Sequence, residues 1–167
     1  MLTRSNLAWA SRLLDDVPVE LDQIDRRIIQ LLMADGRASY GTIGAEVNLS
    51  APAVKRRIDR LRDRGVISGF TVRVDPAATG WTTEAYVELF CNRSTSGAEV
   101  LRRVETYPEV VEAFTVTGDA DTLLHVFAAD MQHFERVLSQ VSAEPFVART
   151  RSVLVLSPLL RRDFLSM

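Results

Sequence analysis

The first third of the chain carries apolar residues at the three-and-four spacing typical of buried helix faces. From Asp22 this spacing predicts a helix that ends near Gly36, and its inward residues are Ile24, Ile28, Leu31 and Leu32. A second, short helix is predicted from about Tyr40, with inward residues Ile43 and Val47. Asn48 and Leu49 then predict a tight turn, because the helical spacing stops there and starts again shortly afterwards.

A third helix is predicted to begin directly after this turn. Ser50 is a favourable N-cap residue, and Pro52 fits the first turn of a helix, where no helical hydrogen-bond donor is lost. Gly65 is predicted to end the helix, and its inward face is formed by Val54, Ile58 and Leu61. Because a very short turn joins the second and third helices, the three helices are interpreted as a helix-turn-helix unit.

Beyond Gly65 the pattern changes to β-strands that alternate with helices. Residues 66–74 predict one strand, and residues 75–80 a linker. The following segment predicts strands at 83–92, 110–117, 121–128 and 147–156. Two helices separate them, marked by Val100, Val104 and Tyr107 and by Met131, Phe134, Leu138 and Val141. The βαββαβ order predicts a ferredoxin-like antiparallel sheet with both helices on one face.

The predicted fold class is therefore α+β, with an N-terminal helix-turn-helix (winged-helix-like) domain and a C-terminal ferredoxin-like domain. The expected divisions are an N-terminal extension, the helix-turn-helix domain, a strand with a linker, the ferredoxin-like domain, and a C-terminal tail. They span residues 1–19, 20–65, 66–80, 81–157 and 158–167, respectively.

The first strand of the ferredoxin-like domain has apolar residues on both faces. Ala85, Val87, Leu89 and Cys91 alternate on one face, whereas Tyr86 and Phe90 lie on the other. No helix of this chain is expected to cover that second face, and uncovered apolar sheet surface indicates a partner. We therefore expect a homodimer.

The charge distribution points to one basic segment. The 167-residue chain has a net charge of -2, yet residues 50–73 hold seven basic and two acidic side chains. Such a segment is a candidate for phosphate binding, although a run of charges is also typical of a solvated helix face. No stretch approaches the roughly 18 apolar residues of a membrane helix, so we expect no membrane association and a cytoplasmic protein.

A helix-turn-helix unit reads DNA by placing its last helix in the major groove. With the apolar residues inward, Ala51, Pro52, Lys55, Arg56 and Asp59 face outward. Lys55 or Arg56 can contact guanine O6 and N7, and Arg60 is expected to meet a phosphate. For Arg57 two interpretations stay open: an internal ion pair with Asp25 or Asp59, or a DNA contact. The predicted DNA-binding set is Ser50, Ala51, Pro52, Lys55, Arg56, Arg57 and Arg60.

Several motifs together resemble the Lrp/AsnC family of leucine-responsive, or feast/famine, transcriptional regulators. The resemblance covers about residues 20–157. It is carried by the segments 21–28, 35–40, 49–50, 57–58, 65–70, 74–76, 118–121 and 147–152, together with Gly80.

This resemblance implies a sequence-specific DNA-binding regulator that forms homodimers, which assemble further, commonly to octamers. It implies that strand 66–74 pairs with its symmetry mate. It also implies an amino-acid effector held between subunits, near the Gly-x-x-Asp hairpin and the loop before the last strand. The effector-binding residues carried over are Gly118, Asp119, Ala120, Asp121, Glu144, Phe146 and Val147.

Two positions depart from the family pattern. The family usually has an aromatic residue where Ala120 stands and a glycine where Phe146 stands. Ala120 removes bulk from one side of the expected site, and Phe146 adds bulk to the other. We therefore expect a reshaped pocket that accepts a different amino acid or none.

Other classes of protein find little support in the sequence. No nucleophile elbow, phosphate loop or nucleotide-binding fingerprint is present, so no catalytic residue and no enzyme activity are expected. His125 and His133 have no ligand-spaced partner, so no metal or other cofactor is expected. Two alternatives to a specific regulator remain: an architectural DNA-compacting protein, and an amino-acid-binding regulatory subunit of a metabolic enzyme.

Overall fold

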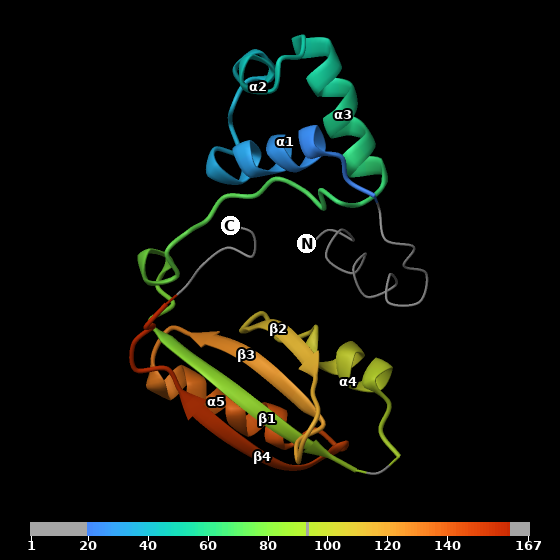
Figure 1. Ribbon diagram of the computed structural model, residues 1–167. Coiled ribbons are helices and arrows are strands. Elements are labelled where there is room, and N and C mark those ends of the chain that lie inside the picture. Colours follow the sequence, from blue (N-terminus) through green and yellow to red (C-terminus); the bar gives the residue numbers. More distant parts are fainter. Residues whose placement is uncertain (1–19, 93, 161–167) are drawn as a thin grey trace. The chain divides into compact units, whose positions relative to one another are not determined.

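The computed structural model describes residues 20–92 and 94–160, which form parts of two compact units that divide between Val72 and Arg73 (Figure 1). The predicted extension at 1–19 and the last residues of the predicted tail lie outside the described residues. The division falls inside residues 66–74, the segment predicted as a strand, and before the linker predicted at 75–80.

The N-terminal unit consists of three helices, α1 (Gln23–Ala34), α2 (Tyr40–Val47) and α3 (Ala51–Asp63). Side chains that precede the first two helices satisfy their free N–H groups. The Asp22 carboxylate accepts a hydrogen bond from the Asp25 N–H at 2.7 Å, and the Ser39 hydroxyl accepts one from the Thr42 N–H at 3.0 Å. The predicted starts of all three helices are therefore confirmed.

The core of this unit joins one apolar face from each helix. Its fully buried residues are Ile28 from α1, Ile43 from α2, and Val54 and Ile58 from α3. Ile24, Leu31, Leu32 and Val47 are only partly buried around this core. The inward faces predicted from the three-and-four spacing are thus confirmed, and the burial of Val54 and Ile58 fixes which side of α3 faces away from the core.

A close backbone approach holds α2 against the turn that precedes α3. The Leu49 N–H donates to the Gly44 carbonyl at 3.0 Å, and Asn48 adopts the left-handed conformation with φ 55°. A Cβ atom on Gly44 would lie only 2.3 Å from the Leu49 carbonyl oxygen. Glycine at this position is therefore required by the short connection between the two helices.

The predicted strand at residues 66–74 does not form in the structure. After Gly65 the Val66 and Ile67 N–H groups both bond to the Leu61 carbonyl, and the segment then continues as irregular backbone. The apolar residues Phe70, Val72 and Val74 are exposed. The prediction of a strand is corrected for the single chain, and the pairing of this segment with its symmetry mate stays a prediction. The physical reason is that a strand requires a hydrogen-bonded neighbour, and the described residues supply none here.

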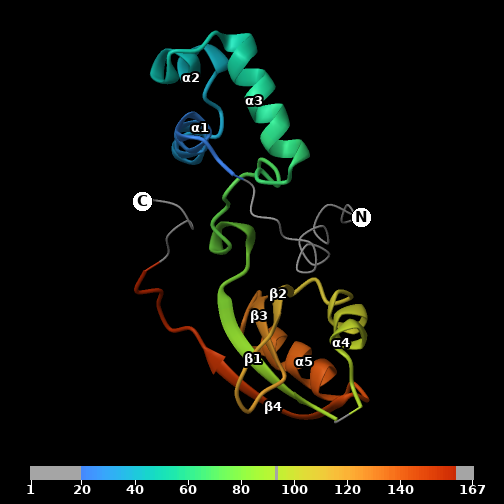
Figure 2. The same ribbon diagram turned by 45° about the vertical axis from the view of Figure 1, so that its right-hand side comes forward.

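The C-terminal unit has the predicted βαββαβ order. Its elements are β1 (Thr83–Cys91), α4 (Gly97–Val104), β2 (Val110–Thr115), β3 (Thr122–Ala128), α5 (Met131–Ser142) and β4 (Val147–Leu154). The strands form one antiparallel sheet in the order β2-β3-β1-β4. Figure 2 shows α4 and α5 on the same face of this sheet. The ferredoxin-like architecture is confirmed.

The core of the C-terminal unit lies between the sheet and these two helices. Alternate residues of β1 and β3 point into it, together with Val100 and Val104 of α4 and Phe134, Val137 and Val141 of α5. Two details differ from the prediction. Tyr107 lies beyond α4, which ends at Val104, and Met131 is exposed because it occupies the first position of α5.

The close approach at Gly44 generates a stability prediction. Gly44→Ala should destabilise the N-terminal unit by roughly 1–3 kcal/mol, because the added methyl group collides with backbone that cannot move freely. Gly41→Ala in the same helix is the matched control. Its Cβ would meet nothing closer than 3.7 Å, so it should stabilise by up to about 1 kcal/mol. Chemical unfolding of both variants tests this, and equal stability of the two would contradict it.

Candidate nucleic-acid interface and effector site

The outer face of α3 is the candidate nucleic-acid interface. Its exposed residues are Ala51, Pro52, Lys55 and Arg56, preceded by the exposed Ser50. Ser50 has the backbone conformation of an N-cap but makes no side-chain capping hydrogen bond. Pro52 explains this in part, because it occupies one of the first-turn positions whose N–H an N-cap side chain usually binds.

The two basic residues at the centre of this face differ in their partners. The Lys55 ammonium donates to the Asp59 carboxylate at 2.6 Å, one turn further along the helix, and this hydrogen bond raises the pKa of Lys55. Arg56 makes no ion pair or hydrogen bond with any described residue. Both residues are predicted to read guanine. Lys55 would first have to give up its hydrogen bond to Asp59, whereas Arg56 can bind DNA without losing a partner among the described residues.

Arg57 and Arg60 point back towards α1 and form ion pairs there. The Arg57 guanidinium donates to Asp22 at 2.6 Å and to Asp25 at 2.7 Å, and Arg60 donates to both Asp25 oxygens, the shorter distance being 2.7 Å. The interpretation of Arg57 as an internal ion pair with Asp25 is confirmed, and Asp59 binds Lys55 instead. The expectation that Arg60 is available for a phosphate is corrected in one respect, because its guanidinium is already paired with Asp25.

Asp22 contributes to this cluster and was missed by sequence reasoning. Two hydrogen bonds, from the Arg57 guanidinium and then from the Asp25 N–H, lower the pKa of its carboxyl group below the ordinary value. Asp22 and Arg57 are 35 positions apart, so neither periodicity nor local spacing connects them. The only signal in the sequence was the acidic residue before α1 together with the basic residues of α3.

The candidate effector loops meet at the end of β1. The Asp121 carboxylate accepts a hydrogen bond from the Cys91 N–H at 2.7 Å, and the Phe146 carbonyl accepts one from the Asn92 N–H at 2.9 Å. Because Cys91 and Asn92 are adjacent, these two contacts attach the segment after β2 and the segment before β4 to neighbouring residues. The two predicted groups of effector residues are thus brought to the same end of the sheet.

Within the first loop, Gly118 and Asp119 are exposed, and Gly118 has a φ of 118°, which favours glycine. Ala120 is buried, and Asp121 is held by the Cys91 N–H. Asp119 and Asp121 are both exposed, and the Asp121 carboxylate is already bound by the Cys91 N–H.

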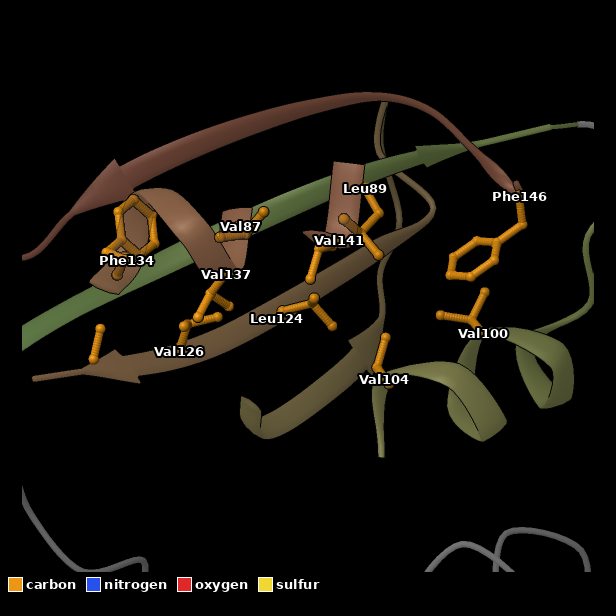
Figure 3. Close-up of a cluster of buried hydrophobic side chains, with 12 residues drawn as sticks. Val87, Leu89, Val100, Val104, Leu124, Val126, Phe134, Val137, Val141 and Phe146 are labelled. Atoms are coloured by element: carbon orange, nitrogen blue, oxygen red, sulfur yellow. The ribbon is translucent and has the colours of Figure 1, made fainter. Parts of the chain in front are cut away.

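In the second loop two predicted residues have structural contacts of their own. The Tyr107 hydroxyl donates to the Glu144 carboxylate at 2.7 Å, and Arg103 lies 3.8 Å from the other Glu144 oxygen. Figure 3 shows the ring of Phe146 beside Val100 in the hydrophobic core, and Val147 packs against the same core. The expectation that Phe146 adds bulk to the effector pocket is corrected: its ring adds bulk to the core. Tyr107, Arg103 and Asn92 were not predicted.

The face of the sheet opposite the helices carries aromatic and charged side chains. The ring of Tyr86 stacks on His125 with centroids 4.6 Å apart, and the Arg149 guanidinium lies 3.7 Å above the ring of Phe90. In the register of the sheet, Tyr86 lies between His125 and Val153, and Val153 is exposed. The predicted placement of Tyr86 and Phe90 on this face is confirmed, but both residues are only partly exposed, with His125 and Arg149 lying on their rings.

Metal and membrane sites receive no support from the described residues. Among residues 20–92 and 94–160, no group of three or more potential ligands could hold a metal ion. His125 lies between Glu84 and Glu112, each of which faces a different ring nitrogen. None of the helices in this part of the chain is long and apolar enough to span a bilayer.

Comparison with known proteins gives a consistent result for both units. Residues 21–62 match the model of the AsnC-type helix-turn-helix domain, and residues 84–163 match that of the Lrp/AsnC ligand binding domain. A three-helix DNA-binding unit joined to a ferredoxin-like ligand-binding unit defines a class of transcriptional regulators. The chain belongs to the Lrp/AsnC family.

Individual relatives support the same assignment. The chain is 47% identical over 142 residues to the HTH-type transcriptional regulator Rv2324 of Mycobacterium tuberculosis. The matched region covers 85% of this chain and 96% of that protein. It is 33% identical to the HTH-type transcriptional regulator FL11 of Pyrococcus horikoshii, over 83% of this chain and 91% of that one. These relatives are named as transcriptional regulators and not as enzymes. The chain is therefore a DNA-binding transcriptional regulator of the Lrp/AsnC type.

Solved structures agree with the fold. A transcriptional regulator from Neisseria meningitidis, solved as a complex with L-Met, is 27% identical with a TM-score of 0.79 and covers 85% of this chain and 94% of that one. AsnC of E. coli, at 21% identity, has a TM-score of 0.82 over 86% of this chain and 97% of that one, and this likeness shows the fold alone.

The Tyr107–Glu144 hydrogen bond generates a prediction about pH. Burial, and then the hydrogen bond to Glu144, raise the pKa of Tyr107 from its ordinary value near 10 to about 12. A raised pKa in the folded state means that the protonated hydroxyl stabilises the fold fully below pH 10, and that this contribution is lost as the pH rises through 12. Tyr107→Phe should therefore lower stability by about 1 kcal/mol near neutral pH.

The difference between wild type and Tyr107→Phe should shrink between pH 10 and 12. Denaturant unfolding of both proteins across this pH range measures the difference in their free energies of unfolding. Ionisation of the other tyrosines affects both proteins equally and therefore cancels in this difference. A difference that stays constant up to pH 12 would show that the Tyr107 hydroxyl does not make this contribution.

Proposed function

We propose that this regulator binds specific duplex DNA sites as a homodimer, with the outer face of α3 in the major groove, and that an amino acid bound between subunits modulates its binding. The observation that carries the proposal is the exposed guanidinium of Arg56, which has no partner among the described residues. It lies on the outer face of a helix whose opposite face is fully buried.

The DNA contact follows from the orientation of α3. The first two turns of a recognition helix reach base edges, and these turns carry Ala51, Pro52, Lys55 and Arg56. Arg56 can donate two hydrogen bonds to guanine, and such a contact discriminates by about 1–3 kcal/mol. Ala51 and Pro52 have no side-chain donor and suit a thymine methyl group, whereas Ser50 suits a phosphate. Arg60, predicted to meet a phosphate, is paired with Asp25 of α1. Arg57, paired with two carboxylates, is left out of the contact surface.

A second copy of the chain is the proposed occupant of the open sheet face. Tyr86, Phe90 and exposed Val153 lie on the face of the sheet that α4 and α5 leave uncovered, and the exposed apolar positions of residues 70–74 provide a strand-forming segment. Dimerisation presents two recognition helices, so the DNA half-sites should be related by two-fold symmetry. The family resemblance supports further assembly of dimers to an octamer.

The proposed effector is an amino acid, supported by the ligand-binding family model and by the related regulator solved with L-Met. Exposed amide groups around Gly118 suit its carboxylate, and the exposed Asp119 carboxylate suits its ammonium group. Ala120, Asp121, Glu144, Phe146 and Val147 then shape the site from positions that are buried or hydrogen-bonded. An effector that favours one assembly over another changes DNA binding by population shift. We propose a cytoplasmic location, where the regulator meets DNA.

The role of Arg56 predicts a loss of sequence preference. Arg56→Ala should reduce the ratio of specific to non-specific DNA affinity by the equivalent of about 1–3 kcal/mol, because the bidentate base contact is lost. Arg27→Ala is the control, since Arg27 is a half-exposed arginine on α1 that pairs with Glu46. Binding titrations with a selected and a scrambled duplex measure both ratios. Equal ratios for wild type and Arg56→Ala would refute this role.

The effector site predicts ligand-induced stabilisation. At one hundred times its dissociation constant, an amino acid that binds only the folded protein adds about 2.7 kcal/mol of stability. A thermal-shift screen against the twenty amino acids should therefore identify at least one ligand. The shift should be lost in Asp119→Asn and kept in Glu105→Gln, which removes another exposed carboxylate of the same unit. The absence of a shift with all twenty would refute the amino-acid effector.

A further inference from the structure

The ion pairs between α1 and α3 form a closed cluster of four charged side chains: Asp22, Asp25, Arg57 and Arg60. The Asp25 side chain is only 3% exposed, and both of its oxygens accept hydrogen bonds from arginines. Asp22 supplies a second acceptor for Arg57, while its other oxygen caps α1. The cluster therefore balances two negative charges against two positive charges at the side of the recognition helix.

Burial makes Asp25 an unusual choice for a merely stabilising contact. Placing the Asp25 carboxylate away from water costs free energy that its attraction to the two partly exposed arginines offsets only in part, and an apolar contact of the same size often stabilises as well or better. A helix interface already sealed by Ile28 and Val54 does not need an ionic cluster to hold it together. The cluster therefore calls for a role connected with its charges.

The consequence of the cluster for DNA binding follows from where its arginines lie. Arg57 follows Arg56 directly, and Arg60 lies one turn further along the same helix. An arginine that is free to reach phosphates strengthens binding to every DNA sequence and adds no preference among sequences. Arg57 is 24% and Arg60 45% exposed, and both are tied to carboxylates on α1.

We propose that Asp25, assisted by Asp22, is a specificity-determining positioning residue: it holds Arg57 and Arg60 against α1, which limits their contacts with DNA phosphates and leaves base recognition to the outer face of α3. This inference rests on the proposed function, because it concerns the balance between specific and non-specific binding by the same helix. Asp25 itself touches no DNA in this arrangement. It acts through the two arginines.

The experiment compares wild type, Asp25→Asn and a control with the same change in charge. Glu46→Gln removes one negative charge from the same unit, but Glu46 pairs with Arg27 of α1 and not with α3. The DNA probes are a duplex selected by the wild-type full-length chain from random sequences, and a scrambled duplex of equal composition. Affinity for both is measured between about 50 and 200 mM salt, the range in which released counterions dominate the salt dependence.

Asp25→Asn is expected to bind the scrambled duplex more tightly than wild type at low salt, and so to lose specificity. Each arginine that reaches a phosphate should steepen the plot of log affinity against log salt by about 0.9, equivalent to about a 3.5-fold greater loss of affinity over this range. Glu46→Gln should keep the wild-type slope. The double variant Asp25→Asn/Arg57→Gln should recover part of the wild-type slope, since one released arginine is then absent.

A structural role for Asp25 gives a different result. If the variant merely weakens the fold, its affinity for both duplexes falls by the same factor and the salt slope is unchanged, which would overturn the proposal. Thermal melting monitors folding of every variant. If Asp25→Asn does not fold, Asp22→Asn replaces it, because asparagine keeps the helix cap and removes the charge.

Asp22→Asn removes one of the two carboxylates that hold Arg57. It should therefore steepen the plot of log affinity against log salt by less than Asp25→Asn does. An unchanged slope in this variant would also overturn the proposal. Failure of the proposed function would give a different result from an unchanged salt slope in either variant. In that case wild type itself would bind the selected and scrambled duplexes equally.

Discussion

The buried apolar face of α3 determines what the N-terminal unit can do. Val54 and Ile58 are sealed against Ile28 and Ile43, so α3 cannot rotate about its own axis without exposing them to water. Full burial of side chains of this size stabilises by about 1.5–3 kcal/mol each. That constraint turns Arg56 outward and Arg57 towards α1, although the two residues are adjacent in the sequence. The chemistry of the DNA-binding face is therefore a consequence of packing on the opposite side of the helix.

The C-terminal unit applies the same constraint to a sheet. Two helices bury one face of β1 and β3, and the alternation of strand side chains then places Tyr86 and Phe90 on the other face. Antiparallel pairing of both β3 and β4 with β1 places the loops before β3 and β4 at the end of β1, where Asp121 and the Phe146 carbonyl anchor them. The proposed dimer surface and the proposed ligand site thus lie on parts of the sheet that the core leaves available.

The helices and the order of the strands could be predicted from the sequence because their signals are local. Apolar residues at three-and-four spacing mark the buried faces of α1 and α3, and alternating apolar residues mark β1. These signals do not depend on distant parts of the chain. The segment 66–74 alternates equally well but stays irregular, since strand pairing depends on a neighbour that the described residues of this chain do not supply. Local pattern cannot provide that information.

The details of the candidate sites were harder to predict because they depend on contacts between distant residues. The partners in the Asp22–Arg57 and Tyr107–Glu144 hydrogen bonds are 35 and 37 positions apart. Phe146 was expected at the ligand site from its position in a family motif, yet its apolar ring is more stable in the core. The outward residues Lys55 and Arg56 were predicted correctly because helical geometry alone determines their side.

The central claim is that the outer face of α3 reads the sequence of duplex DNA. It is tested most directly by incubating the full-length protein with random-sequence duplexes and sequencing those that remain bound after repeated selection. The account predicts an enriched, two-fold symmetric motif whose half-sites are separated by one helical turn of about 10–10.5 base pairs, or by a multiple of it. A bound pool without any enriched sequence would contradict the account, and would instead indicate a protein that compacts DNA through its phosphates.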